Sequence, residues 1–179
     1  MGKSELTGPN PYLGNELTAV ERHASIVESR VLRDESATQA LAAALSRLPA
    51  LRNACIELHG NLGAGKTTFV RHLLRALGVQ GRIKSPTYAV VEPHEVPGLS
   101  IWHFDFYRFS DPREWEDAGF RDIFASPGLK LAEWPEKAAG LLPLADLAIE
   151  LQARPDESRA VTLTAHTATG AALLQGLPT

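Results

Sequence analysis

The chain has 179 residues, a formal net charge of −3 and one cysteine, Cys55. This length suits a single α/β domain with a core of its own and is too short for two large ones. The slight acidic excess argues against binding nucleic acid through overall charge, because neutralising phosphates requires a basic face.

No window of the sequence approaches 18 consecutive apolar residues, and the N-terminal stretch lacks the apolar middle of a signal peptide. A single cysteine cannot form an internal disulfide, which fits a reducing compartment. We therefore expect a soluble protein that is located in the cytoplasm and does not bind membranes.

The first part of the chain carries no convincing periodicity. We interpret residues 1–30 as a flexible extension, in which Ala19–Val27 could form a short helix, and residues 31–179 as a single domain.

The domain begins with a pattern that predicts a helix over residues 34–48. Asp34 can cap this helix, and Leu41, Leu45 and Leu48 repeat at helical spacing until Pro49 ends it.

Residues 60–67 read Gly-Asn-Leu-Gly-Ala-Gly-Lys-Thr, which is the complete G-x-x-x-x-G-K-[ST] pattern. An apolar strand is predicted before it, over residues 54–59, and an amphipathic helix after it, over residues 66–77. In this context the glycines let backbone N–H groups point at phosphate oxygens, Lys66 reaches the β- and γ-phosphates and the Thr67 hydroxyl ligates Mg²⁺. The pattern predicts a loop that binds the phosphates of a nucleotide together with Mg²⁺.

The remainder alternates strands and helices. Two strands forming a hairpin around a turn at 93–98 are predicted over residues 87–91 and 100–107, a helix over 111–124, a strand over 129–134, a short helical piece over 135–142, a pair of strands over 147–151 and 160–164, and a last helix over 167–177. This order predicts an α/β fold of the P-loop NTPase class, in three layers, with a largely parallel central sheet extended by antiparallel strands.

Two predicted strands end in an acid, Asp105 and Glu133. Acids at strand ends beside a phosphate loop supply the hard oxygen ligands that a nucleotide-bound Mg²⁺ needs, although ordinary solvated carboxylates also occur at such positions. Ser85-Pro86-Thr87 follows the loop helix, where a hydroxyl can sense the γ-phosphate, or where the chain simply turns into a strand. Trp134 and His103 are interpreted as packing residues.

Five motifs in order carry a resemblance: the loop at 60–68, Lys-Ser-Pro-Thr-Tyr at 84–88, His-Phe-Asp-Phe-Tyr-Arg at 103–108, Asp-Pro at 111–112, and Glu-Trp-Pro-Glu at 133–136 followed by Leu-Pro at 142–143. Over residues 31–175 the chain resembles the TsaE (YjeE) family of bacterial ATPases. The resemblance implies an ATPase, with ATP or ADP as its bound nucleotide, required for the N6-threonylcarbamoyl modification of adenosine 37 in tRNAs that read codons beginning with A. It also implies a monomer when alone that works with the TsaB–TsaD pair, in which TsaD carries the transfer chemistry, so that tRNA is met indirectly through that complex.

The resemblance also implies roles for individual residues. Catalytic roles fall to Lys66, Thr87 and Asp105, metal ligation to Thr67 and Glu133, and nucleotide binding to Asp34, Gly63, Ala64, Gly65, Lys66, Thr67, Thr68 and, on a late strand, Arg159. The chain departs from the family at Asn61, where Asp is usual, and at Phe106, where Leu is usual. Asn61 removes one negative charge beside the phosphates, which bears on hydrolysis rate more than on binding.

Two other classes share the loop. A small kinase, transferring the γ-phosphate to a small acceptor, would need arginines clustered over that phosphate, but Arg108, Arg113 and Arg121 are dispersed in the sequence. A GTP-driven switch would need an Asn-Lys-x-Asp run to read guanine, and the sequence has none.

Overall fold

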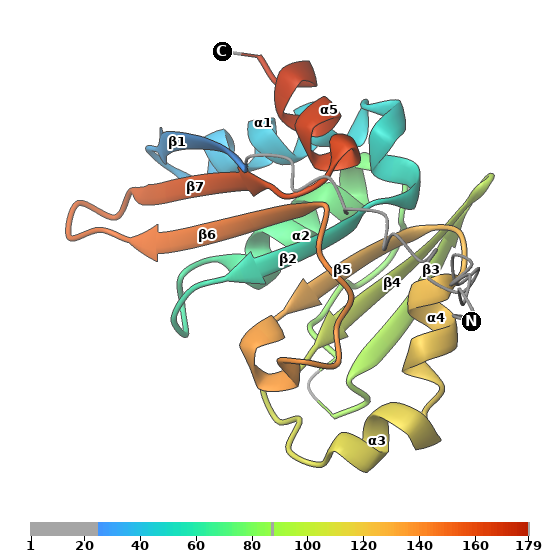
Figure 1. The fold of residues 1–179 in the computed structure, drawn as a ribbon. Coiled ribbons are helices and arrows are strands. Elements are labelled where there is room, and N and C mark those ends of the chain that lie inside the picture. The colour runs from blue at the N-terminus through green and yellow to red at the C-terminus, as the bar shows by residue number, and fades with distance from the viewer. Residues whose placement is uncertain (1–24, 87, 179) are drawn as a thin grey trace, which may run out of the picture.

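A computed structural model describes residues 25–86 and 88–178 (Figure 1). In this part of the chain seven strands form one sheet in the order β1-β7-β6-β2-β5-β4-β3. The strands are β1 (Ile26–Leu32), β2 (Cys55–His59), β3 (Val91–Val96), β4 (Leu99–Asp105), β5 (Leu129–Glu133), β6 (Leu147–Ala153) and β7 (Arg159–Ala165).

The centre of the sheet is parallel and its flanks are antiparallel. β2 pairs in parallel with β5 and β6, and β5 pairs in parallel with β4. β3, β7 and β1 extend this core as antiparallel strands. The fold class predicted from the sequence is confirmed, and the carboxyl ends of β2, β4 and β5 lie at one edge, where open α/β sheets bind their ligands.

Helices lie on both faces of the sheet. They are α1 (Glu35–Ser46), the 3-10 helix η1 (Pro49–Asn53), α2 (Lys66–Ala76), α3 (Pro112–Asp117), α4 (Phe120–Ala125), the 3-10 helix η2 (Pro135–Ala138) and α5 (Ala168–Gly176). Apolar side chains of α1, α2 and α5 join Ile56 and Leu131 in one buried cluster. Trp115 and Phe120, from α3 and α4, pack on Phe104 and Phe106 in a second. In the described residues no helix is long and apolar enough to cross a bilayer.

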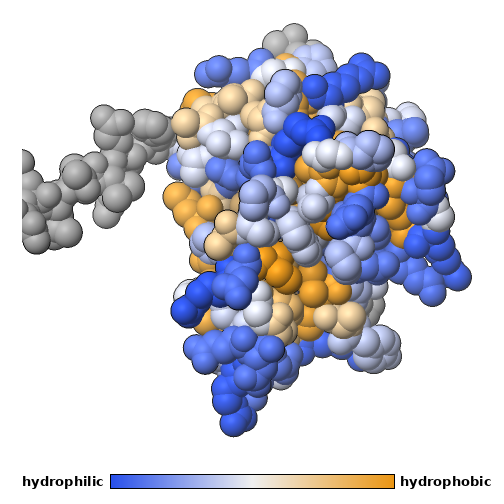
Figure 2. All heavy atoms as spheres, turned by 90° about the vertical axis from the view of Figure 1, so that its right-hand side faces the viewer, coloured by the Kyte–Doolittle hydropathy of each residue, from blue (hydrophilic) through white to orange (hydrophobic). Residues whose placement is uncertain are grey.

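The side of the molecule that carries β3 and α4 is shown in Figure 2. Hydrophilic side chains make up most of its periphery, and hydrophobic atoms show through in patches between them.

One strand lies inside the segment interpreted as an extension. β1 begins at Ile26 and pairs along its whole length with β7, so the boundary at residue 30 is wrong for these residues. Ile26 and Val27 are strand residues and not the end of a helix, and residues 1–24 lie outside the described part of the chain. β1 is an edge strand in which Glu28 and Arg30 take partly buried positions while Val27 and Val31 are exposed, so its sequence lacks the apolar alternation that indicates a strand.

Two further elements differ from expectation. The first strand of the predicted hairpin runs over Val91–Val96 and not over 87–91, because Pro93 is tolerated in an edge strand and the turn falls on Pro97-Gly98. The helix predicted over 111–124 is broken into α3 and α4 by Gly119, which has a φ of 69°.

Candidate nucleotide site

The phosphate loop connects β2 to α2, and three of its glycines have positive φ angles: Gly60 at 136°, Gly63 at 80° and Gly65 at 109°. A Cβ on Gly60 would lie 2.3 Å from the carbonyl oxygen of Leu151, so only glycine fits there. The glycines thus do what the sequence motif requires of them, namely turn the backbone tightly beside β6.

Lys66 begins α2 and folds back over the loop. Its Nζ donates to the carbonyl oxygens of Gly60 at 2.5 Å and Asn61 at 2.9 Å, and lies 3.8 Å from the centre of the Trp134 ring. Burial lowers the pKa of this ammonium, while the nearby carboxylates, Glu133 foremost, act in the opposite direction. Trp134, interpreted as a packing residue, is therefore a half-buried wall of the site.

The two predicted acids lie side by side. Asp105 and Glu133 are paired residues of the parallel strands β4 and β5, and both are buried. Asp105 accepts hydrogen bonds from the Ser85 hydroxyl and, at 2.9 Å, from the Tyr107 N–H. Glu133 Oε2 accepts from the Thr67 hydroxyl at 2.7 Å. Strand register therefore brings both acids to the loop.

These side chains line one cleft of about 430 Å³. Its lining includes Leu62, Gly63, Gly65, Lys66, Thr67, Thr68, Ser85, Asp105, Tyr107, Arg108, Glu133 and Trp134. Thr87, the remaining predicted catalytic residue, lies outside the described residues.

The donors in this cleft fit Mg²⁺ that arrives with a nucleotide. A hydroxyl and a carboxylate, Thr67 and Glu133, are hard oxygen ligands and already lie within hydrogen-bond distance of each other. Residues 25–86 and 88–178 contain no group of three or more His, Cys, Asp or Glu able to hold an ion unaided. Mg²⁺ is commonly held by one or two carboxylates together with substrate phosphates, which matches this incomplete set.

A second, smaller cleft lies against the other side of the loop and includes Asp34, Thr38, Gly65, Thr68 and Arg159 in its lining. Asp34 is the N-cap of α1, as predicted, because its Oδ1 accepts from the Ala37 N–H at 2.8 Å. The Ser36 hydroxyl, at 2.6 Å, is the largest cause that lowers the pKa of Asp34.

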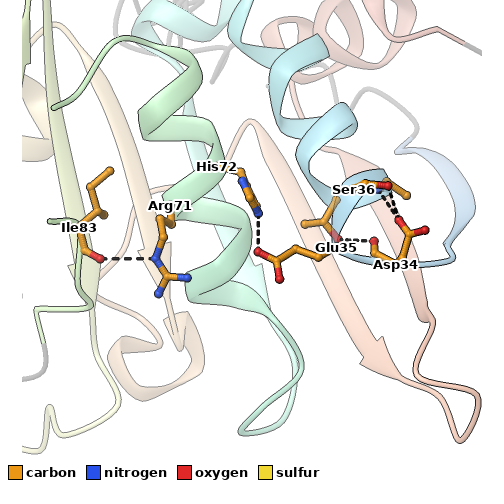
Figure 3. Close-up of polar contacts among 8 residues, drawn as sticks. Asp34, Glu35, Ser36, Arg71, His72 and Ile83 are labelled. Atoms are coloured by element: carbon orange, nitrogen blue, oxygen red, sulfur yellow. Dashed lines mark hydrogen bonds and ion pairs between the residues drawn. The ribbon is translucent and has the colours of Figure 1, made fainter. Parts of the chain in front are cut away.

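Figure 3 shows how this cap is tied to α2. Glu35, the first residue of α1, places its Oε1 2.9 Å from Nε2 of His72 on α2. One residue earlier, Arg71 Nε donates to the carbonyl oxygen of Ile83 at 3.5 Å. Side chains of α2 therefore join α1 on one side and the segment that leads to Ser85 on the other.

Arg159 supports the loop from β7. Its Nε donates to the carbonyl oxygen of Ala64 at 3.1 Å, and its Nη1 donates to the carbonyl oxygens of Ser158, at 3.2 Å, and of Glu157. The arginine singled out on the late strand is thus in contact with loop backbone and lines the cleft that holds Asp34.

His103 is a site residue that the sequence interpretation missed. Its side chain is fully buried, and Nε2 lies 2.7 Å from Oε1 of Glu133. A carboxylate only accepts hydrogen bonds, so Nε2 donates here. The available signal was its position: it shares the face of β4 that carries Asp105, which belongs to the site.

The family described as "Threonylcarbamoyl adenosine biosynthesis protein TsaE" matches residues 32–161 of this chain. The chain belongs to the TsaE family. A relative from Haemophilus influenzae, named tRNA threonylcarbamoyladenosine biosynthesis protein TsaE, is 45% identical over 115 residues, which are 64% of this chain and 72% of the relative. The TsaE of Bacillus subtilis is 36% identical, over 62% of this chain and 68% of its own length.

A solved structure agrees with the TsaE assignment. The crystal structure of Bacillus subtilis YdiB aligns with a TM-score of 0.68 and 26% identity, covering 86% of this chain and 95% of YdiB. The resemblance found in the five motifs is therefore confirmed.

Proposed function

We propose that this chain is a Mg²⁺-dependent ATPase that supports formation of N6-threonylcarbamoyladenosine at position 37 of tRNAs reading codons that begin with A, acting in the cytoplasm with the TsaB–TsaD complex. The names of its relatives support the pathway. The observation that supports the ATPase proposal is the hydrogen bond from Thr67, in a complete phosphate loop, to Glu133.

Each part of the site has a task in this proposal. Loop N–H groups and Lys66 bind the phosphates, and Thr67 and Glu133 hold the metal ion. When bound, Mg²⁺ stabilises the charge that develops on the β- and γ-phosphate oxygens. Asp105 is held by Ser85 and the Tyr107 N–H, so it can orient water beside the γ-phosphate without moving.

The output of hydrolysis is proposed to be a conformational change that the TsaB–TsaD complex reads. A chain with no basic excess is poorly suited to hold tRNA by charge. The arginines do not favour the kinase alternative, since Arg108 lines the cleft while Arg113 pairs with Asp111 at 2.9 Å and Arg121 is exposed on α4.

A reconstituted assay tests the proposal. Phosphate release from ATP and GTP, phosphoryl transfer to small acceptors and tRNA modification would be measured with and without the TsaB–TsaD pair. We expect ATP-specific phosphate release and repeated rounds of tRNA modification that require this chain. If the pair modifies tRNA repeatedly at full rate with this protein omitted, the pathway role is wrong. Transfer to an acceptor instead of release would make it a kinase.

The metal role is tested separately with Glu133→Gln, which keeps the shape of the side chain but removes its charge. We expect this variant to lose Mg²⁺-dependent nucleotide binding and hydrolysis while retaining metal-free ADP binding. A Mg²⁺–nucleotide structure with Glu133 beyond about 5 Å from the ion, against about 2.1 Å for direct ligation, would contradict its role as a ligand.

A further inference from the structure

Glu133 uses its two oxygens for different partners. Oε2 faces the loop and accepts from Thr67 at 2.7 Å, whereas Oε1 faces the interior and lies 2.7 Å from His103. Only 1% of the Glu133 side chain is exposed, and His103 is fully buried. Oε1 therefore has a hydrogen-bond partner that is buried away from solvent.

Within the described part of the chain, the contact with Glu133 is the hydrogen bond that the His103 ring makes. Among the described residues Nδ1 of His103 is buried and has no hydrogen-bond partner. Two neighbouring positions on the same face, Ile101 and Leu131, are apolar and fully buried, whereas the residue paired with His103 on β3 is the partly buried Glu92. A leucine would fill such a place without burying an unpartnered nitrogen. The free-energy cost of burying the histidine nitrogen is therefore offset by its hydrogen bond to Glu133.

We propose that His103 is a positioning residue that fixes the Glu133 carboxylate so that Oε2 alone faces Thr67 and the metal ion. The inference rests on the proposed function, since it assigns His103 to the same Mg²⁺ site. A free glutamate carboxylate can rotate and offer either oxygen or both to a cation. With Oε1 held by a rigid buried donor, Glu133 meets the ion with one oxygen in a set direction, as supporting residues commonly arrange around metal sites.

Three substitutions separate positioning from packing. His103→Gln places an amide N–H near the position of Nε2 and can still donate to Glu133. His103→Asn is equally polar but shorter, so it cannot reach. His103→Leu fills the space without a donor. The matched control is His94→Leu on β3. The His94 ring also has a buried nitrogen, Nε2, without a partner among the described residues, but it makes no described hydrogen bond to Glu133.

The measurement is the binding of a fluorescent ADP analogue while Mg²⁺ is titrated, with a parallel measurement in EDTA. We expect the Mg²⁺ midpoint to rise tenfold or more in the Asn and Leu variants and to stay within about threefold in the Gln and His94 variants. Metal-free binding should be equal in all of them, because the loop itself is intact.

An unchanged Mg²⁺ midpoint in a folded His103→Leu would overturn the proposal and leave His103 a packing residue. If thermal unfolding shows that the Leu variant does not fold, the Gln and Asn pair decides, and equal behaviour of the two counts against positioning. Wild-type protein that binds Mg²⁺–ADP but never hydrolyses ATP would defeat the proposed function and leave this inference standing. Wild-type binding that ignores Mg²⁺ would defeat both.

Discussion

Arg159 donates from Nε to the carbonyl oxygen of Ala64, so β7, the last strand in the chain, contacts the backbone of the phosphate loop. The arginine contacts a carbonyl of the loop, so it does not compete with phosphates for the loop N–H groups. The terminal hairpin of β6 and β7 is therefore part of the candidate nucleotide site and not only an extension of the sheet.

Replacing Arg159 with Ala should weaken ATP and ADP binding about tenfold, roughly 1.4 kcal/mol, because a charged hydrogen bond to the loop is lost. Lysine should not restore affinity, since it lacks the fixed fork that reaches Ala64 and the hairpin carbonyls together. Calorimetric titration with ADP measures this. Arg154→Ala, an exposed arginine of the same hairpin, is the control, and an effect of equal size there would remove the specific role of Arg159.

Lys66→Ala and Thr67→Ala should each lower ATP turnover by about a hundredfold or more, roughly 2.7 kcal/mol, because the phosphate charge and the metal lose their partners. ADP binding should fall less, since the backbone cradle remains. Phosphate release under saturating ATP is the measurement, with the exposed Lys137→Ala as control. Normal turnover, or full tRNA modification, in Lys66→Ala would show that this loop is not the working one.

Thr87→Ala should keep ADP affinity within about threefold, roughly 0.6 kcal/mol, while tRNA threonylcarbamoylation in the reconstituted system drops tenfold or more. Thr87 lies outside the described residues, so its role stays a prediction from the sequence. Two residues earlier, Ser85 contacts Asp105, which links this segment to the site. Equal modification rates for Thr87→Ala and for the distant control Thr162→Ala would argue against a γ-phosphate sensor here.

His59, the residue before the loop, makes stability depend on pH. Its hydrogen bond to Glu57, 3.1 Å long, is the largest cause that raises the pKa of His59 above its ordinary 6.5, against the effect of burial. The contact therefore stabilises the fold fully below the unfolded pKa, and its contribution is lost as pH rises through the higher folded pKa.

Urea unfolding at about pH 5.5 and pH 8.5 checks this dependence. The free energy of unfolding should fall further between these two values in the wild type than in His59→Gln. Glu57→Gln should lose most of the same pH dependence, because Glu57 is the largest of the causes that raise the pKa of His59. Identical pH slopes in the wild type and His59→Gln would show that the pair contributes nothing.

The parts of the site that follow local rules could be predicted from the sequence. The loop is contiguous, and the acids end apolar strands, so Lys66, Thr67, Asp105 and Glu133 meet once neighbouring parallel strands are in register. The orientation of Trp134 against Lys66 could not be predicted, because it depends on the φ of 56° that Trp134 itself adopts just after β5.

Long-range contacts between unlike residues were harder to foresee. The contact between His103 and Glu133 joins two strands whose side chains otherwise pack as an apolar core, so a histidine there reads as filler until the register is known. β1 could not be predicted because Glu28 and Arg30 occupy its partly buried face, and because its existence depends on a partner at the other end of the chain.

That pairing has a consequence for synthesis. β1 leaves the ribosome first among the described strands, whereas β7, the strand it pairs with, leaves last. At a synthesis rate of about 5–20 residues per second, β7 is made on the order of ten seconds after β1. During that time the nascent chain presents an unpaired strand with Val27 and Val31, which stay exposed even in the finished fold. Pairing of β1 with β7 is thus a late event in synthesis, because a nascent chain that ends before Arg159 contains β1 without its partner strand.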